Sequence, residues 1–413
     1  MLTSVQSRKA NQFLSIPRAY DHAVVIGSGI AGLTAVRVLS DYFNQVTIIE
    51  RDMLETPHEF RRGVPQGRHT HTLMPRGQVI LEQLFPGLLD EMKANGAVSI
   101  EAETDIAFYK DGRWQAPFQR ATNIASSRPL LECILRRRVM ALPNVSLITG
   151  CNVIGLLTDA GGKRVTGLTL RPRRGAVCTE NELAANLVVD TSGRASKAPQ
   201  WLEDLGYTPP EEWRINPFVA YTSCLYERPA NHDGSWKTLY ISPEPPHGTR
   251  GGIILPMENG RWCATLIGVA GDVPPNDEEG FLAFARSLPT SSFYDAIKEA
   301  KPLSKPIGFQ RTENRVRRYD KMPEYLDGFL VCGDAAIALN PIYAQGMTAA
   351  AQAANALQRS LQAQQRQSPD SLDGLAARFQ QTMSKAVQRL WRIATTNDWD
   401  WPITEVTDDL DDQ

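Results

Sequence analysis

The sequence predicts a mixed α/β fold, into which an antiparallel sheet is inserted and which ends in a helical segment. Two observations carry this prediction. Near the N-terminus a β-branched run, a glycine-rich turn, a helical stretch and a second β-branched run follow one another within about 30 residues. After residue 200 the chain changes to short runs rich in aromatic and β-branched residues, which are typical of an antiparallel sheet.

Strands and helices alternate over the first 200 residues. We expect strands at 23–26, 46–49, 145–149, 153–157, 165–170 and 187–189, helices from the glycine-rich turn to about Ser40, at 79–92 and at 130–142, a loop at 57–76 and a hairpin around Asp111-Gly112. Downstream we expect strands at 219–226, 237–241, 252–256, 262–269 and 329–331, and helices at 346–362 and from 371 to about 393. Glu258-Asn259-Gly260 is a tight-turn signal between two of these strands.

Composition excludes several classes of protein. The 413 residues carry a formal net charge of −2, so no global field would hold a polyanion, and nucleic acid is not an expected partner. No apolar run reaches the roughly 18 residues of a membrane span, and residues 1–20 lack the apolar core of a secretory signal. The six cysteines lie far apart without a C-x-x-C pair, which fits reduced core residues. We therefore expect a cytoplasmic globular protein.

The segment 27–32 reads G-S-G-I-A-G, a G-x-G-x-x-G between the first strand and the first helix. Gly27 permits a tight turn, Gly29 lets a phosphate approach the backbone, and Gly32 allows close packing of helix on strand. The unpaired N–H groups of the helix N-terminus favour an anion at the same point. Glu50 ends the second strand, where its carboxylate accepts ribose hydroxyl protons and would repel a 2′-phosphate. The segment predicts bound FAD or NAD in preference to NADP.

A second glycine and acid lie far downstream. The expected strand 329–331 runs into Gly333 and Asp334, and Gly346 opens an alanine-rich helix. NAD is compact and needs no such second turn, whereas FAD does, because its ribitol and flavin ring lie far from its adenine. Asp334 would accept a ribitol hydroxyl, and the helix N-terminus would face the flavin edge where negative charge accumulates on reduction. This pair favours FAD.

A third element is 188–194, V-V-D-T-S-G-R, a strand that ends in Asp190 and small residues. In this order the three elements resemble the FAD-dependent monooxygenases of the aromatic-hydroxylase type, the class A flavoprotein monooxygenases. The segments 61–71 (RRGVPQGRHTH) and 340–343 (NPIY) are similar to a branch with squalene-epoxidase-like enzymes and the epoxidases of polyether polyketide pathways. The resemblance covers most of 21–400. It implies a Rossmann-like FAD-binding domain of the GR2 type, with an inserted antiparallel-sheet substrate domain and a C-terminal helical segment.

The resemblance implies a discontinuous division of the chain, because glycines near residue 30 and acids near 190 and 334 must reach one FAD. Residues 1–20 would be an N-terminal extension, 21–76, 120–200 and 311–365 the FAD-binding domain, 77–119 and 201–310 the substrate domain, and 366–413 a C-terminal helical segment with an acidic tail.

The resemblance also implies which residues bind FAD, without a covalent bond. Arg128 would meet the phosphate or ribitol side, Val153 the adenine through its backbone, and Gln66 would pass near the flavin. The full expected set is Gly27, Gly29, Gly32, Glu50, Arg51, Gln66, Arg128, Val153, Asp190, Gly333, Asp334, Gly346 and Met347.

Two positions depart from the family pattern. The mid-chain motif reads Asp190-Thr191-Ser192-Gly193, whereas the family pattern has an Asp directly followed by Gly. In aromatic hydroxylases this mid-chain motif is linked to NADPH handling. The reductant is therefore open: NADH or NADPH that binds transiently, or a separate flavin reductase. Ala344 stands where many relatives have glycine, and its methyl group would narrow the pocket beside the flavin or alter the mobility of the loop.

The implied activity is that of an FAD-dependent monooxygenase that uses O₂ and NAD(P)H through a C4a-hydroperoxyflavin. We expect it to epoxidise alkenes of a lipophilic secondary metabolite, a polyketide or terpenoid. The alternatives are an aromatic hydroxylase, a double-bond reductase of the geranylgeranyl reductase type, and a non-enzymatic flavin-binding sensor or scaffold. The sequence does not fix the oligomeric state.

No catalytic side chain can be named, because the cofactor carries the reactive oxygen. Tyr221, Tyr240 and Trp262 are candidates for the walls of the substrate cavity, with core packing as the alternative. His69 and His71 form an H-x-H pair in the expected loop, but no third ligand has a recognisable spacing. We expect no metal site.

Overall fold

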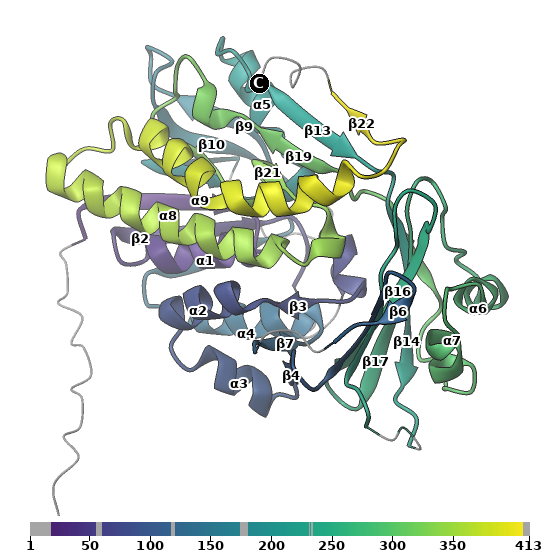
Figure 1. Ribbon diagram of the computed structural model, residues 1–413. Helices are drawn as coiled ribbons and strands as arrows, with labels where there is room; N and C mark the ends of the chain where they lie inside the picture. Colours follow the sequence, from purple (N-terminus) through teal and green to yellow (C-terminus); the bar gives the residue numbers. More distant parts are fainter. Residues whose placement is uncertain are drawn as a thin grey trace, which may run out of the picture.

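The computed structural model describes residues 18–54, 60–116, 120–173, 181–230, 232 and 234–407. A parallel sheet flanked by long helices stands beside a larger, mostly antiparallel sheet (Figure 1). The expected mixed α/β fold, with a parallel sheet, added antiparallel sheets and C-terminal helices, is confirmed. The expected N-terminal extension, apart from residues 18–20, lies outside the described residues. The four aspartates of the expected acidic tail lie outside them too.

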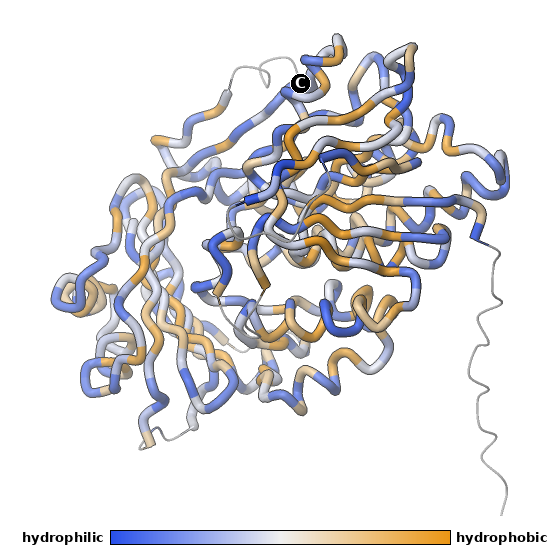
Figure 2. Tube along the Cα trace, turned by 180° about the vertical axis from the view of Figure 1, so that it is seen from behind, coloured by the Kyte–Doolittle hydropathy of each residue, from blue (hydrophilic) through white to orange (hydrophobic). Residues whose placement is uncertain are grey.

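The parallel sheet gathers strands from distant parts of the chain. In spatial order they are β20 (Phe329–Val331), β12 (Leu187–Asp190), β1 (Tyr20–Ile26), β2 (Phe43–Glu50) and β8 (Val145–Thr149). The central strands are apolar runs, seen as hydrophobic segments of the tube in Figure 2, because both of their faces are covered. Their carboxyl ends meet at one edge, which positions the site described below.

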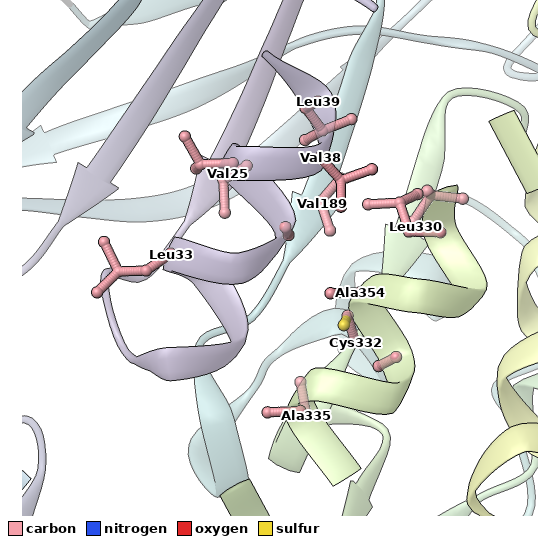
Figure 3. Packing of buried hydrophobic residues seen from close by; sticks show 14 of the residues in the cluster. Val25, Leu33, Val38, Leu39, Val189, Leu330, Cys332, Ala335 and Ala354 are labelled. Atoms are coloured by element: carbon pink, nitrogen blue, oxygen red, sulfur yellow. The ribbon is translucent and has the colours of Figure 1, made fainter. Parts of the chain in front are cut away.

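Three helices cover one face of this sheet: α1 (Ile30–Leu39), α8 (Gly346–Gln367) and α9 (Leu375–Asp398). Helix α8 contacts both α1 and α9. Figure 3 shows Leu33 and Val38 of α1 with Ala354 of α8, beside Val25 and Val189 of the sheet. Small alanine side chains let α8 approach α1 closely. The two C-terminal helices extend beyond the expected limits, to Gln367 and Asp398.

The expected single helix at 79–92 is two helices, α2 (Pro75–Leu84) and α3 (Leu88–Ala94). The break lies at Pro86 and Gly87, since proline lacks an N–H donor and Gly87 adopts a left-handed φ of 78°. The other α-helices of the described residues are α4 (Arg128–Met140), α5 (Ala198–Asp204), α6 (Glu278–Arg286) and α7 (Ser292–Ile297). Short 3-10 turns are η1 (Pro65–Arg68), η2 (Gly193–Ala195), η3 (Tyr319–Lys321), η4 (Gly333–Ala335) and η5 (Pro341–Tyr343).

The large sheet has the order β18 (Ile307–Phe309), β14 (Ala220–Glu227), β17 (Arg261–Gly268), β16 (Arg250–Met257), β15 (Thr238–Ile241), β5 (Ile106–Lys110) and β6 (Arg113–Trp114). Its pairs are antiparallel except β15 with β5, which run parallel. Asn259 and Gly260 take positive φ values of 63° and 64°, as the expected tight turn between β16 and β17 requires. α6 and α7 lie on the outer side (Figure 1), so the inner side faces the parallel sheet.

Smaller sheets complete the fold. They contain β9 (Cys151–Thr158), β10 (Val165–Pro172) and β11 (Glu182–Ala184); β3 (Thr72–Leu73), β7 (Thr122–Ala125) and β4 (Val98–Glu101); and β13 (Glu212–Asn216), β19 (Asn314–Arg317), β21 (Ile337–Ala338) and β22 (Glu405–Val406). Cys151 is disulfide-bonded, so the expectation of reduced cysteines was wrong for this residue, because separation along the chain does not report distance in the fold. Within the described residues, none of the helices is both long and apolar enough to span a bilayer.

Candidate functional site

A cavity of about 420 Å³ runs from the carboxyl ends of β1 and β2 to the inner side of the large sheet. At one end it is lined by Gly27, Gly29 and Glu50. At the other end it is lined by aromatic and aliphatic side chains: Tyr221, Tyr240, Ile253, Ile267 and Phe309. A polar, glycine-lined compartment is thus continuous with an apolar one.

Two glycines on the cavity wall are explained by neither backbone conformation nor packing. Gly29 has an ordinary φ of −74°, and a Cβ added to it or to Gly346 would meet no protein atom within 4 Å. Gly32 is different, because its Cβ would lie 2.0 Å from the carbonyl oxygen of Gly27. Gly32 is therefore required by helix–strand packing, whereas the open space at Gly29 and Gly346 fits a group that approaches the backbone.

The carboxylate of Glu50 is buried at the end of β2. It accepts hydrogen bonds from the backbone N–H groups of Ser28 and Asp52, each at 2.9 Å, and pairs with Arg61 at 2.9 Å. Burial alone would raise the pKa of Glu50, but Arg61 and these hydrogen bonds outweigh it and lower the pKa. Glu50 is therefore an ionised acceptor at neutral pH.

Arg61 is a site residue whose role the sequence did not reveal. Its guanidinium bridges Glu50 and Glu132, with a distance of 2.6 Å to the Glu132 carboxylate, and Arg128 binds the other oxygen of Glu132 at 2.7 Å. This network ties the 60–71 segment to α4 and to the end of β2. The available signal was the Arg-Arg-Gly segment, which marked a resemblance but not this contact.

The loop before α8 forms another wall. Pro341, Ile342 and Ala344 line the cavity, followed by Gly346 and Met347 in the first turn of α8. Asp334 lines the cavity at the turn after β20. The N-terminus of α8 therefore opens on the cavity, where its free N–H groups favour negative charge.

Asp190 lies behind the cavity wall. It is fully buried and accepts hydrogen bonds from the N–H of Ser192 at 2.8 Å and the hydroxyl of Ser196 at 2.5 Å. Burial raises its pKa. Asp190 thus holds the turn whose Ser192 and Gly193 line the cavity, and acts on the site only through that turn.

The apolar end carries few polar groups: Arg311 at its border with the second hollow, and a buried group around His69 that is neutral. Nδ1 of His69 is 2.8 Å from the hydroxyl of Ser223, which lies 2.6 Å from that of Thr265. Burial, helped by His71 and Arg68, lowers the pKa of His69 to about 3. Burial and Arg128 lower that of His71 to about 4. In the described ranges, no cluster of three or more His, Cys, Asp or Glu side chains could hold a metal ion.

The structure brings most of the expected residues to one cavity. Those that line it are Gly27, Gly29, Glu50, Arg51, Gln66, Arg128, Val153, Asp334, Gly346, Met347, Tyr221 and Tyr240. Gly32, Asp190 and Gly333 stand behind the wall. Trp262 lies on the outer side of the sheet, stacked on Trp236 with ring centroids 5.3 Å apart, because side chains alternate along β17 and Thr265 and Ile267 take the inner side. Trp262 is therefore a core residue and not a cavity residue.

A second hollow of about 430 Å³ adjoins the apolar end and shares Tyr221, Phe309 and Arg311 with it. The rings of Tyr221 and Phe309 are stacked at 5.4 Å between the two spaces. This pair is therefore the partition between the cavity and the hollow.

Comparison with known proteins agrees with this geometry. Residues 21–390 match the family described as FAD binding domain. The chain belongs to this family. Protein Rv3254 of Mycobacterium tuberculosis is 35% identical over 387 residues, covering 92% of this chain and 80% of that protein. Squalene monooxygenase of Mus musculus is 24% identical over 360 residues, which are 84% of this chain and 55% of that enzyme.

Among solved structures, PqsL of Pseudomonas aeruginosa, a probable FAD-dependent monooxygenase, superposes with a TM-score of 0.68 at 17% identity, covering 92% of this chain and 96% of PqsL. It has also been solved with 2-aminobenzoylacetate. The resemblance to class A FAD-dependent monooxygenases is thereby confirmed, as are FAD as the cofactor and the oxidoreductase class of this family member. The open space at Gly29 and Gly346 fits a dinucleotide pressed against the backbone at two places.

Proposed function

We propose that this member of the family is a monooxygenase that epoxidises an alkene of a lipophilic secondary metabolite. The observation that carries the proposal is the continuity of the glycine-lined compartment with the apolar one. FAD in the first compartment would supply the activated oxygen, and a substrate in the second would lie at its edge.

In this proposal FAD follows the cavity from β2 to α8. Gly29 leaves room for the pyrophosphate, Gly27 makes the tight turn before it with a φ of 99°, and Glu50 accepts from the adenosine ribose. Asp334 accepts from the ribitol. Gly346 leaves room for the flavin ring at the N-terminus of α8. The proposal includes the division of the chain given above, with the parallel-sheet segments as the FAD-binding domain.

Apart from Arg311 at its border with the second hollow, the apolar end presents aromatic, aliphatic and neutral polar side chains, which supports a neutral substrate. Hydroxylation of a phenol gains from a base that ionises the phenol. His69 is a weak base with a pKa of about 3, and burial raises the pKa of Tyr221 well above its ordinary value. An alkene needs no such base, only a dry cavity beside the flavin. We propose that it enters through the second hollow, past Tyr221 and Phe309.

Two probes of different chemistry test the proposal. Squalene is a polyene, and 2-aminobenzoylacetate is an aromatic amine. We expect the FAD-loaded protein to insert one atom of ¹⁸O from ¹⁸O₂ into squalene or a shorter terpenoid alkene as an epoxide, with NADH or NADPH as the transient reductant or with an added flavin reductase. Mass spectrometry of the product decides the matter. A labelled hydroxylated aromatic product, or a saturated alkene without label, would overturn the epoxidase assignment.

A further inference from the structure

Asp398, the last residue of α9, is a buried carboxylate that the sequence did not single out; its exposed fraction is 1%. It accepts hydrogen bonds from the hydroxyl of Tyr343 at 2.5 Å, from Nδ2 of Asn314 at 2.5 Å and from Nδ2 of Asn340 at 3.2 Å. In the part of the chain that the structure describes, no lysine or arginine pairs with it. A buried carboxylate without a cation is costly, so its position calls for an explanation.

Two of these partners belong to the loop that lines the cavity. Asn340 and Tyr343 bracket the short turn η5, and their neighbours Pro341, Ile342 and Ala344 face the cavity. Asn340 is fastened twice more, because its N–H donates to Oδ1 of Asn314 at 2.7 Å and its own Oδ1 accepts from the N–H of Ile342 at 3.3 Å. The loop is thus held from behind by α9.

Ala344 shows why the loop needs this support. Its φ is 54°, a left-handed conformation that is unfavourable for a residue with a Cβ. Such residues persist where the surrounding structure over-determines them, and they gather at functional sites. The hydrogen bonds that end at Asp398 supply this constraint immediately before Ala344 and the first turn of α8.

We propose that Asp398 is a positioning residue that holds the loop 340–345 and the first turn of α8 in the shape that receives the flavin. The inference rests on the proposed placement of FAD at α8. A carboxyl group suits the task because all three partners donate, and its two oxygens accept from all of them. A neutral amide would turn its own N–H donors toward at least one of them.

The charge state of Asp398 should make opening of the loop depend on pH, a dependence that would be absent if Asp398 had only a passive structural role. Burial raises the pKa of Asp398 from 3.8 to about 6. Besides its direct partner Tyr343, the titratable groups that act on the pair are Tyr240 and Asp400. Because the carboxyl is more acidic once water reaches it, ionisation favours opening of the loop. With a pKa of 3.8 in the open state and about 6 in the closed state, opening should increase about tenfold from pH 5 to pH 7.5.

Hydrogen exchange of the peptide that contains 340–347, measured on protein without FAD and corrected for intrinsic rates, tests this directly. We expect the tenfold increase in the unmodified protein and a flat profile in Asp398→Asn. At pH 6, Asp398→Ala and Tyr343→Phe should exchange at least about tenfold faster, because buried hydrogen bonds are lost. Glu405→Gln removes an exposed carboxylate that does not act on the pair and serves as the matched control, with unchanged exchange.

The same variants are then titrated with FAD. Weaker binding in Tyr343→Phe, with Glu405→Gln unchanged, supports the link from the loop to the flavin. If Asp398→Ala does not fold, Tyr343→Phe and Asp398→Asn still decide the matter. Equal exchange and equal pH profiles in all variants would overturn the positioning role. Altered exchange in a protein that takes up no FAD would instead overturn the proposed function and leave the role of Asp398 in the loop intact.

Discussion

Substituting Gly29 by alanine separates the needs of the fold from those of the cofactor. The glycine has an ordinary φ of −74°, and the added methyl group would project into open space, so the ligand-free protein should tolerate it. Loss of a favourable N-cap glycine destabilises the folded protein, and the lower entropy of the unfolded chain stabilises it, each by up to about 1 kcal/mol. The free energy of unfolding without FAD should therefore change by no more than about 1 kcal/mol.

Binding of FAD should respond differently, because the methyl group occupies the space of the pyrophosphate. Overpacking costs about 1–3 kcal/mol, which corresponds to a Kd raised by about 5- to 150-fold. Fluorescence titration with FAD gives the Kd, and chemical denaturation of the ligand-free protein gives the stability.

Gly32→Ala is the matched control three residues along the same motif. Its Cβ would lie 2.0 Å from the carbonyl oxygen of Gly27 and 2.8 Å from the hydroxyl of Thr191, so the helix must move. We expect this variant to lose stability before FAD is added. An unchanged Kd in Gly29→Ala, or equal loss of stability in the two variants, would refute the placement of the pyrophosphate at Gly29.

Three further predictions follow from contacts in the structure. Ala344→Gly should raise the free energy of unfolding by roughly 0.5–1 kcal/mol, because relief of the left-handed strain exceeds the entropy gained by the unfolded chain; denaturation that shows a loss instead would contradict the strain. Arg61→Ala should cost about 3–5 kcal/mol of stability, since it leaves the buried Glu50 without a cation and Glu132 with Arg128 alone, and the loss should shrink as the pH falls below 5 and the carboxylates take up protons. Trp262→Ala should cost about 3–5 kcal/mol of stability and leave the ratio of oxidation products unchanged, whereas Tyr240→Ala should alter that ratio; the reverse pattern would place Trp262 on the cavity.

The strand–helix–strand unit at the start of the fold and the identity of the cofactor could be predicted because they depend on local chemistry. The glycines at 27–32, Glu50 and Asp334 each sit where a strand ends, and parallel strands bring their carboxyl ends to one edge. Pro86 and Gly87 also carried a readable signal of a helix break, which the apolar pattern across 79–92 concealed.

The faces of the large sheet could not be read in the same way. Both sides of β17 are buried, so its residues lack the alternation of apolar and polar side chains that would tell Trp262 from Thr265. Arg61 and Asp398 were missed for another reason. Their partners, Glu132 and Tyr343, lie tens of residues away along the chain, and only the fold brings each pair together.

The parallel pairing of β15 with β5 and the edge position of β20 have a consequence for the newly made chain. During synthesis β5 emerges long before β15, and β12 has no neighbour on its outer edge until residues 329–331 appear. The nascent protein must therefore carry exposed strand edges through most of its translation. An N-terminal fragment that ends before β20 would keep the glycine motif and yet present an unpaired β12, so the nucleotide-binding half should not be obtainable by truncation.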